Sequence, residues 1–423
     1  MRHLLNTILL SVLLFGCTGK QSYDYPHYNI KLSADPASQY LNVSGSWSIP
    51  AEDESYRLEF YLHRQLRIDK LDINGDKSFK LTSDTSDLRY MPEAVKYTLK
   101  TENPLKKRTI LNFKYSGKIT EWPEWSASVI GRDWTEMGLY FPWYPYNMSL
   151  KPFNYSVEVD IDDSYNIFIM GNEQKKNGHT VYSSADPTND IVVCCSEDLK
   201  TSGTISDDYA VTIGYCTLPE ILRDTLTGDM EEIMSIFNRW FPAGPRNVCL
   251  VESMREKGGG YARLGGIYLS GLEKTDYFSS RRGYTRYLSH EISHLWWYRA
   301  NTNTWEDWLN EGFAEYSALM VLREKYGGEY YDKWIAMKRE NSAGTGAVWH
   351  CDRNGQDAYA ILYSKAPLLI AELEEKTGEE GLKQLMREML EAGVSTTEQF
   401  LSLLEESHGS EVKNWFISRL KEA

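Results

Sequence analysis

The sequence HEISH at positions 290–294 constrains the chain more than any other stretch. It lies inside a helical pattern over 284–299, and residues four positions apart share one face of a helix. His290 and His294 can therefore bind one cation together. Because the chain has only eight histidines in 423 residues, two of them at this spacing around Glu291 predict a helix that carries a metal site.

A third ligand is available in the downstream segment WLNEGFA, which begins or lies within the next predicted helix. Zinc in a catalytic site takes three protein ligands and leaves one position for water, and two histidines with one glutamate are an established set. We therefore expect one Zn²⁺ ion, held by His290, His294 and Glu311. Glu291 would face the water and act as the general base. Glu315, one turn after Glu311, either fixes the orientation of a ligand histidine or is a solvated surface residue.

The periodicity of the chain changes once. Short alternating runs broken by turn residues predict a β-rich domain over 40–216, and helical periodicity predicts a mainly helical domain over 217–423. The expected fold class is α+β multidomain. A dense aromatic stretch over 122–146 is expected to fill a core or a domain interface, with substrate binding as the alternative.

The pairing of HEISH with WLNEGFA resembles the zinc signature of the aminopeptidase N family, the gluzincins related to thermolysin. The resemblance implies a β-rich N-terminal domain before a thermolysin-like, mainly helical catalytic domain. Carried over position by position, it implies that His290, His294 and Glu311 are zinc ligands. It also implies that Glu291 is the general base in hydrolysis of peptide bonds.

A tyrosine completes the resemblance. The segment ILYSKA at 361–366 is similar to the family's tyrosine-containing YxKG segment, with Ala366 in place of the usual glycine. The resemblance implies that Tyr363 donates a hydrogen bond to the oxyanion formed during hydrolysis. Tyr359 is the alternative for the same role.

One segment departs from the family pattern. Residues 258–267 stand where the family has its GAMEN strand, whose glutamate holds the substrate's free α-amine, and none of them is acidic. Strand addition requires no particular side chain, so Gly259, Gly260, Tyr261 and Ala262 are still expected to bind the substrate main chain. The choice between aminopeptidase and endopeptidase therefore stays open.

The first residues predict export. Residues 1–17 combine a basic start with an apolar run that is too short for a permanent membrane helix. Their end, LFGC, resembles a bacterial lipobox, which implies lipidation of Cys17; the alternative is an ordinary secretory signal with a chance cysteine. We expect a tether over 18–39 and a cell-envelope lipoprotein of the periplasm or outer membrane, attached to the membrane through this lipid.

Composition narrows the choice of partners. A formal net charge of −14 argues against a general nucleic-acid binder, because phosphate binding needs a positive surface. The leading hypothesis is a zinc-dependent peptidase that acts on peptides or proteins. The second is a catalytically inactive, peptidase-like lipoprotein that binds peptides, and the third treats the motif residues as structural.

Overall fold

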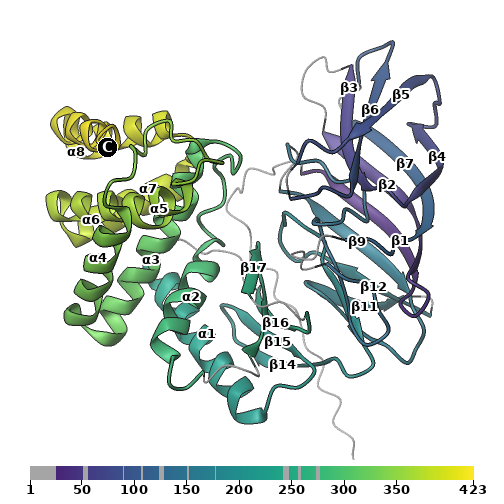
Figure 1. Cartoon of the computed structure of the whole chain (residues 1–423), viewed down its shortest axis with the longest axis horizontal. Helices are drawn as coiled ribbons and strands as arrows, with labels where there is room; N and C mark the ends of the chain where they lie inside the picture. The colour runs from purple at the N-terminus through teal and green to yellow at the C-terminus, as the bar shows by residue number, and fades with distance from the viewer. Residues whose placement is uncertain are drawn as a thin grey trace, which may run out of the picture.

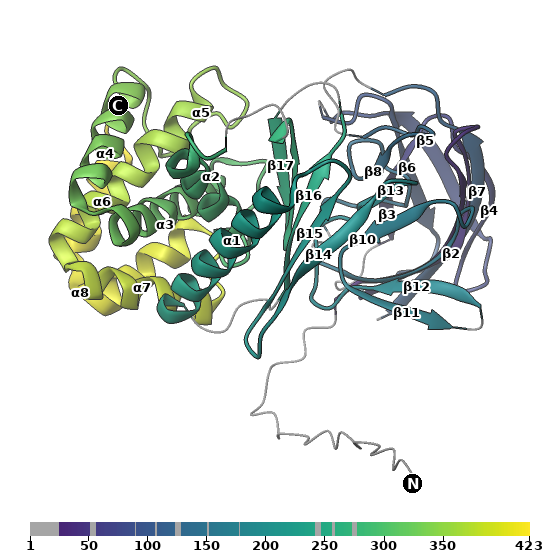
Figure 2. The same cartoon turned by 90° about the horizontal axis from the view of Figure 1, so that it is seen from below.

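The structure is a computed structural model of the chain. It describes residues 25–50, 56–88, 90–105, 108–122, 128–149, 152–176, 178–241, 247–255, 259–272 and 277–423. The predicted signal segment, with Cys17, lies outside these residues. Figures 1 and 2 show a strand-rich part at one end, a smaller sheet in the middle and a helical part at the other end.

The strand-rich part is built on a seven-stranded sheet of order β11-β12-β9-β1-β2-β7-β4. Its strands are β1 (His27–Asp35), β2 (Tyr40–Pro50), β4 (Arg67–Ile73), β7 (Arg108–Lys118), β9 (Asn154–Asp160), β11 (Asn172–Lys176) and β12 (His179–Ser183). Two three-stranded sheets accompany it: β3 (Arg57–His63), β6 (Ala94–Thr101) and β5 (Phe79–Thr85), and β10 (Asn166–Ile169), β13 (Val193–Ser196) and β8 (Thr135–Met137).

Aromatic side chains fill the core of this part. Trp47 stacks on Tyr28, and Phe141, Trp143 and Tyr144 from the predicted aromatic stretch are fully buried. The core interpretation of that stretch agrees with the structure, because these rings contact other core residues.

The predicted tether over 18–39 differs from the structure in its second half. Strand β1 occupies residues 27–35 and pairs with β2 and β9. Tyr28, Ile30 and Leu32 alternate with more exposed neighbours and are buried. This correction has a simple cause: three apolar residues within nine are a weak signal until partner strands cover them.

The middle sheet has five strands in the order β14-β15-β16-β18-β17. They are β14 (Lys200–Ile205), β15 (Ala210–Tyr215), β16 (Asn247–Ser253), β17 (Gly259–Arg263) and β18 (Gly266–Ser270). The predicted boundary at 216/217 cuts this sheet, since β15 pairs with β16 across it. The boundary therefore lies before β14, because periodicity identifies a strand but not its partner.

The helical part packs against one side of the middle sheet (Figure 2). Its helices are α1 (Glu220–Trp240), α2 (Arg281–Ser293), α3 (Trp308–Tyr326), α4 (Gly328–Ser342), α5 (Ala358–Ala360), α6 (Ala366–Thr377), α7 (Glu379–Ala392) and α8 (Thr397–Leu420). Helix α3 is buried on almost every side and contacts α2, α4 and α6. The predicted class, a β-rich part followed by a mainly helical one, is confirmed. Across the described residues, no helix combines the length and apolar character needed to cross a membrane.

Candidate active site

Helices α2 and α3 bring the three predicted metal ligands together. His290 lies near the end of α2, His294 directly follows it, and Glu311 lies in the first turn of α3. Glu311 Oε2 is 3.3 Å from His290 Nε2 and 3.5 Å from His294 Nε2. Two ligand atoms of a tetrahedral zinc site, each about 2.0–2.1 Å from the metal, lie about 3.4 Å apart. The three atoms therefore have the spacing of ligands to one zinc ion.

The chemistry of these atoms also fits zinc. Glu311 Oε2 is buried, and no described residue donates a hydrogen bond of good geometry to it. A buried carboxylate oxygen without a donor is costly unless a cation balances it. Burial opposes the charged form of His290, yet Glu311 and Glu315 on either side raise its pKa to about 10. The site thus attracts positive charge, as a set of two histidines and one glutamate does for zinc.

The ring nitrogens that face away from the metal position have partners. His290 Nδ1 lies 2.9 Å from Oε2 of Glu315, and His294 Nδ1 lies 2.9 Å from the carbonyl oxygen of Trp297. Such partners orient a ligand histidine and fix its tautomer.

Glu315 is 1% exposed and is therefore not the solvated surface glutamate of the alternative interpretation. Its carboxylate accepts two hydrogen bonds from Arg286 Nη1, at 2.7 and 2.8 Å, and one from Lys338 Nζ at 2.6 Å. Lys338 also donates to the carbonyl oxygen of Tyr363 at 2.7 Å. Glu315 thus connects a metal ligand to the segment of the candidate oxyanion donor. Sequence reasoning missed Arg286 and Lys338.

Glu291 is half-buried, and its ligand atom lies within 4.8 Å of those of His290 and His294. It is therefore close enough to act on a water at the metal position. One turn earlier on α2, the Tyr287 hydroxyl is buried, and burial followed by the charge of Glu291 raises the pKa of Tyr287. A Cβ on Gly260 would overlap this hydroxyl, so the absence of a side chain at 260 makes room for it.

Tyr363 lies beside the metal position on a π-helical turn. This turn, η3 (Ile361–Lys365), is inserted between α5 and α6, and such turns are frequent at functional sites. The Tyr363 ring centroid is 5.6 Å from that of His290, while Tyr359 stacks on Tyr363 and is 71% exposed. Lys365 fastens the turn by donating to the carbonyl oxygen of Gly346 at 2.9 Å. The arrangement favours Tyr363 over Tyr359 as the donor.

The predicted substrate strand is an edge strand. β17 contains Gly259, Gly260, Tyr261 and Ala262, and pairs on one side with β18 in antiparallel fashion. An edge strand presents main-chain groups that can pair with an extended peptide.

Two side chains of β17 are directed away from the helices and into the strand-rich part. The Tyr261 hydroxyl donates to Glu136 Oε1 at 2.7 Å, and Arg263 Nε donates to Asp190 Oδ2 at 2.7 Å. Because side chains alternate along a strand, Gly260 and Ala262 face the other way, toward α2. Arg263 therefore pairs with Asp190 instead of facing a substrate amine.

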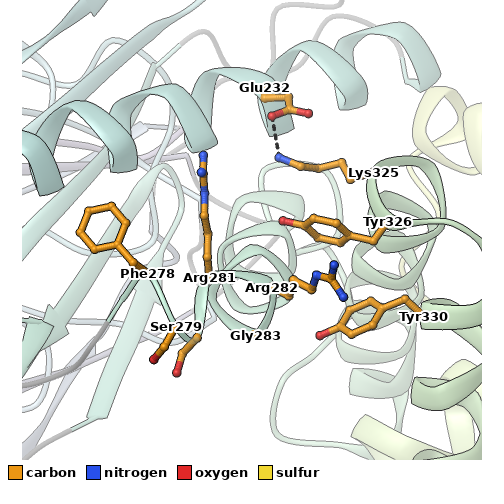
Figure 3. Close-up of a pocket in the computed structure, with 10 residues that line it drawn as sticks. Glu232, Phe278, Ser279, Arg281, Arg282, Gly283, Lys325, Tyr326 and Tyr330 are labelled. Atoms are coloured by element: carbon orange, nitrogen blue, oxygen red, sulfur yellow. Dashed lines mark hydrogen bonds and ion pairs between the residues drawn. The ribbon is translucent and has the colours of Figure 1, made fainter.

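A separate cavity of ≈ 690 Å³ lies at the N-terminal end of α2 (Figure 3). Its cations are largely neutralised: Arg281 pairs with Asp229 at 2.7 Å and Lys325 with Glu232 at 2.6 Å. Arg282 lies over the rings of Tyr326 and Tyr330, which also line the cavity. None of the candidate metal or catalytic residues lines it.

Comparison with known families decides the relationship. Residues 272–419 match the profile of the Peptidase family M1 domain. The chain carries an M1 peptidase domain. This match contains α2 and α3, which carry the predicted metal ligands, and the tyrosine segment, and it supports the family that HEISH and WLNEGFA predicted. The matched segment thus supports a zinc metallopeptidase of the aminopeptidase-like group, a family whose members use zinc.

Solved M1 structures share the fold of the whole chain. An M1 zinc metallopeptidase from Deinococcus radiodurans matches with a TM-score of 0.73 at 16% identity, over 95% of both chains. A mutant of that enzyme bound to a Tyr-Ser-Ala substrate matches with 0.71 at 16% identity, over 94% of both. Leukotriene A4 hydrolase from Saccharomyces cerevisiae matches with 0.70 at 14% identity, over 95% of this chain and 68% of its own. None of the curated proteins matches this chain in sequence.

Proposed function

We propose that the protein is a zinc-dependent peptidase in which His290, His294 and Glu311 hold the metal. The observation that carries this proposal is the position of Glu311 Oε2, 3.3 and 3.5 Å from the two histidine Nε2 atoms. One zinc ion, when bound there, would acidify water and polarise the peptide carbonyl.

Two side chains around the metal position would carry out proton transfer and stabilise the oxyanion. Glu291 takes the proton from the attacking water and passes it to the leaving amine, as a general base and then a general acid. Tyr363 donates a hydrogen bond to the carbonyl oxygen as negative charge develops on it. Burial, followed by the charges of Glu311 and Asp307, raises the pKa of Tyr363, so the hydroxyl keeps its proton and stays a donor.

We further propose that cleavage does not require a free α-amine. No residue of β17 is acidic. Glu136, a buried acid that contacts β17, already accepts from Tyr261, Ser253 and Trp134 and is 0% exposed. Main-chain pairing with the free edge of β17 would then hold an internal segment of a peptide.

A mixed peptide library tests the function and its mode together. Each peptide is supplied with a free and with an N-acetylated terminus, and products are identified by mass spectrometry with and without a chelator. Chelator-sensitive internal cuts that ignore acetylation are the expected result. Loss of single N-terminal residues from free peptides only would establish an aminopeptidase, and zinc binding without any cuts would establish the inactive peptide-binding lipoprotein.

We also propose that the chain is exported and attached to the cell envelope through a lipid on Cys17. The support is the sequence of residues 1–17, with its basic start, apolar run and LFGC end. Mass spectrometry of the protein purified from membranes should show a lipidated N-terminal Cys17. A Cys17→Ser variant should instead be found without the lipid, and an unmodified mature terminus in the parent protein would contradict the proposal.

A further inference from the structure

A cavity of ≈ 740 Å³ lies between the strand-rich part and the helical part. Glu59, Lys96 and Asn189 line it from the strand-rich part, and Asn301, Thr302 and Glu306 line it from the segment between His294 and α3. Neither the metal ligands nor Tyr363 line it, so it is distinct from the catalytic centre.

The cavity begins where the substrate strand ends. Leu264, the residue after β17, is part of its wall, and Asn189 Oδ1 accepts a hydrogen bond from the Leu264 amide at 3.1 Å. Gly260, at the other end of β17, lies beside Tyr287 on the helix that carries Glu291. A strand rises about 3.3 Å per residue, so the four steps from Gly260 to Leu264 cover about 13 Å. A peptide paired with β17 would have about four residues between the base and the cavity.

The opposite wall of the cavity is attached to the start of α3. Ala300, another wall residue, exchanges two hydrogen bonds with Asn310: its amide donates to Oδ1 at 3.1 Å and its carbonyl oxygen accepts from Nδ2 at 3.0 Å. Asn310 directly precedes the ligand Glu311. The wall is thus fixed to the start of α3 at the residue that precedes Glu311.

The lining is suited to a peptide main chain. The side-chain oxygens of Asn189 and Asn301 are used internally, by the amides of Leu264 and Asn303. Among the described residues, nothing accepts a hydrogen bond from either Nδ2 group, so both can donate to a carbonyl oxygen. Lys96 lies 3.6 Å from Glu59 and 3.3 Å from Asp87, so its charge is balanced.

We propose that this cavity is a subsite for the main chain of a peptide substrate, about four residues from the scissile bond. The substrates would accordingly be oligopeptides or extended protein segments rather than dipeptides. This inference rests on the proposed function, because it takes β17 as the strand that pairs with substrate.

Binding to the zinc-loaded Glu291→Gln protein tests the subsite without turnover. The probes are a nine-residue N-acetylated peptide and its truncations, one residue at a time from each end, and the dissociation constant is measured by fluorescence anisotropy. Removing the residue that reaches the cavity should weaken binding about tenfold, the worth of one or two hydrogen bonds. Shortening the peptide from the opposite end should produce no tenfold change in the dissociation constant at the fourth residue from the scissile bond.

A filled cavity provides the second comparison. Thr302 is exposed in the wall, so Thr302→Trp should bring the dissociation constant of the full peptide to that of the truncated one. Asp224→Trp, on the exposed side of α1, is the matched control and should bind every peptide as the parent does. Equal affinity for all lengths, or an equal effect of Thr302→Trp on long and short peptides, would overturn the proposal. Failure of the wild-type protein to cleave any peptide would instead refute the proposed function, and the binding comparison would still decide the subsite.

Discussion

Replacement of Glu315 by glutamine removes one charge from the centre of the site and changes little else. The carboxylate accepts hydrogen bonds from Arg286 twice and from Lys338 once, and it lies 2.9 Å from His290 Nδ1. An amide offers one acceptor oxygen and one NH₂ group, so at least one of these donors must lose its acceptor. The two cations also lose their shared counter-charge.

The expected loss of stability in Glu315→Gln follows from how deeply Lys338 and Arg286 are buried. The Lys338 side chain is 5% exposed and that of Arg286 is 24% exposed. Removing one partner of a buried ion pair costs about 3–5 kcal/mol. Because Arg286 retains contact with solvent, we expect Glu315→Gln to lower the free energy of unfolding of the metal-free protein by about 3 kcal/mol. Loss of the partner of His290 should also weaken zinc binding about 10- to 100-fold.

Denaturant unfolding and competition with a zinc chelator measure these two quantities. Glu329→Gln is the matched control, because Glu329 lies on the surface of α4, is 92% exposed and pairs with Lys333 at 3.6 Å. This control should change the free energy of unfolding by less than about 0.5 kcal/mol. The reasoning would be refuted if Glu315→Gln were as stable as the control and bound zinc with unchanged affinity.

Three further predictions concern the strand, the donor and the metal. Tyr363→Phe should lower kcat about 100-fold with KM and zinc content nearly unchanged, and a kcat within threefold of the parent in steady-state assays would exclude the donor role. Gly260→Ala should lower kcat/KM because the added Cβ would overlap the Tyr287 hydroxyl. In the double variant, Tyr287→Phe should restore part of this loss. If the effects of the two substitutions on kcat/KM were simply additive in this double-mutant cycle, the overlap would be contradicted. The pKa of His290 is raised to about 10 in the metal-free site, so zinc must displace a proton when it binds. Zinc affinity measured by chelator competition should therefore rise about tenfold per pH unit between about pH 6 and 8. A zinc affinity that does not change with pH would contradict this linkage.

The sequence predicted the metal centre because its parts are local. His290 and His294 are adjacent on one face of a single helix, and Glu311 lies one turn into the next described α-helix. The π-helical turn that places Tyr363 beside His290 was not predicted, since no residue type marks an inserted π turn. The tyrosine itself was found only through its resemblance to the family segment.

The partners of Glu315 could not be predicted, because they depend on tertiary packing. Lys338 lies on α4 and reaches Glu315 only because α4 packs on α3. Glu136 and Asp190 likewise reach β17 from the strand-rich part, over separations of 125 and 73 positions in sequence. These groups are buried because the strand-rich part packs against the middle sheet and the helices pack against one another. No pattern in the neighbouring sequence predicts this burial.

The same limit explains the two corrections to the fold. β15 has the alternation of any half-buried strand, and only its parallel pairing with β16 assigns it to the middle sheet. β1 is short of apolar residues and is held by strands on both sides. In both cases the sequence of the strand itself does not show which sheet it joins, because that depends on partner strands that are distant in sequence.

In the proposed mechanism, Glu291 moves the proton while other residues hold the metal. The most direct measurement is peptide turnover by Glu291→Gln, with the zinc content of the same sample determined by elemental analysis. We expect one bound zinc ion per chain and a loss of turnover of at least about 100-fold, because the amide cannot accept the proton. Undiminished turnover with zinc bound would contradict it.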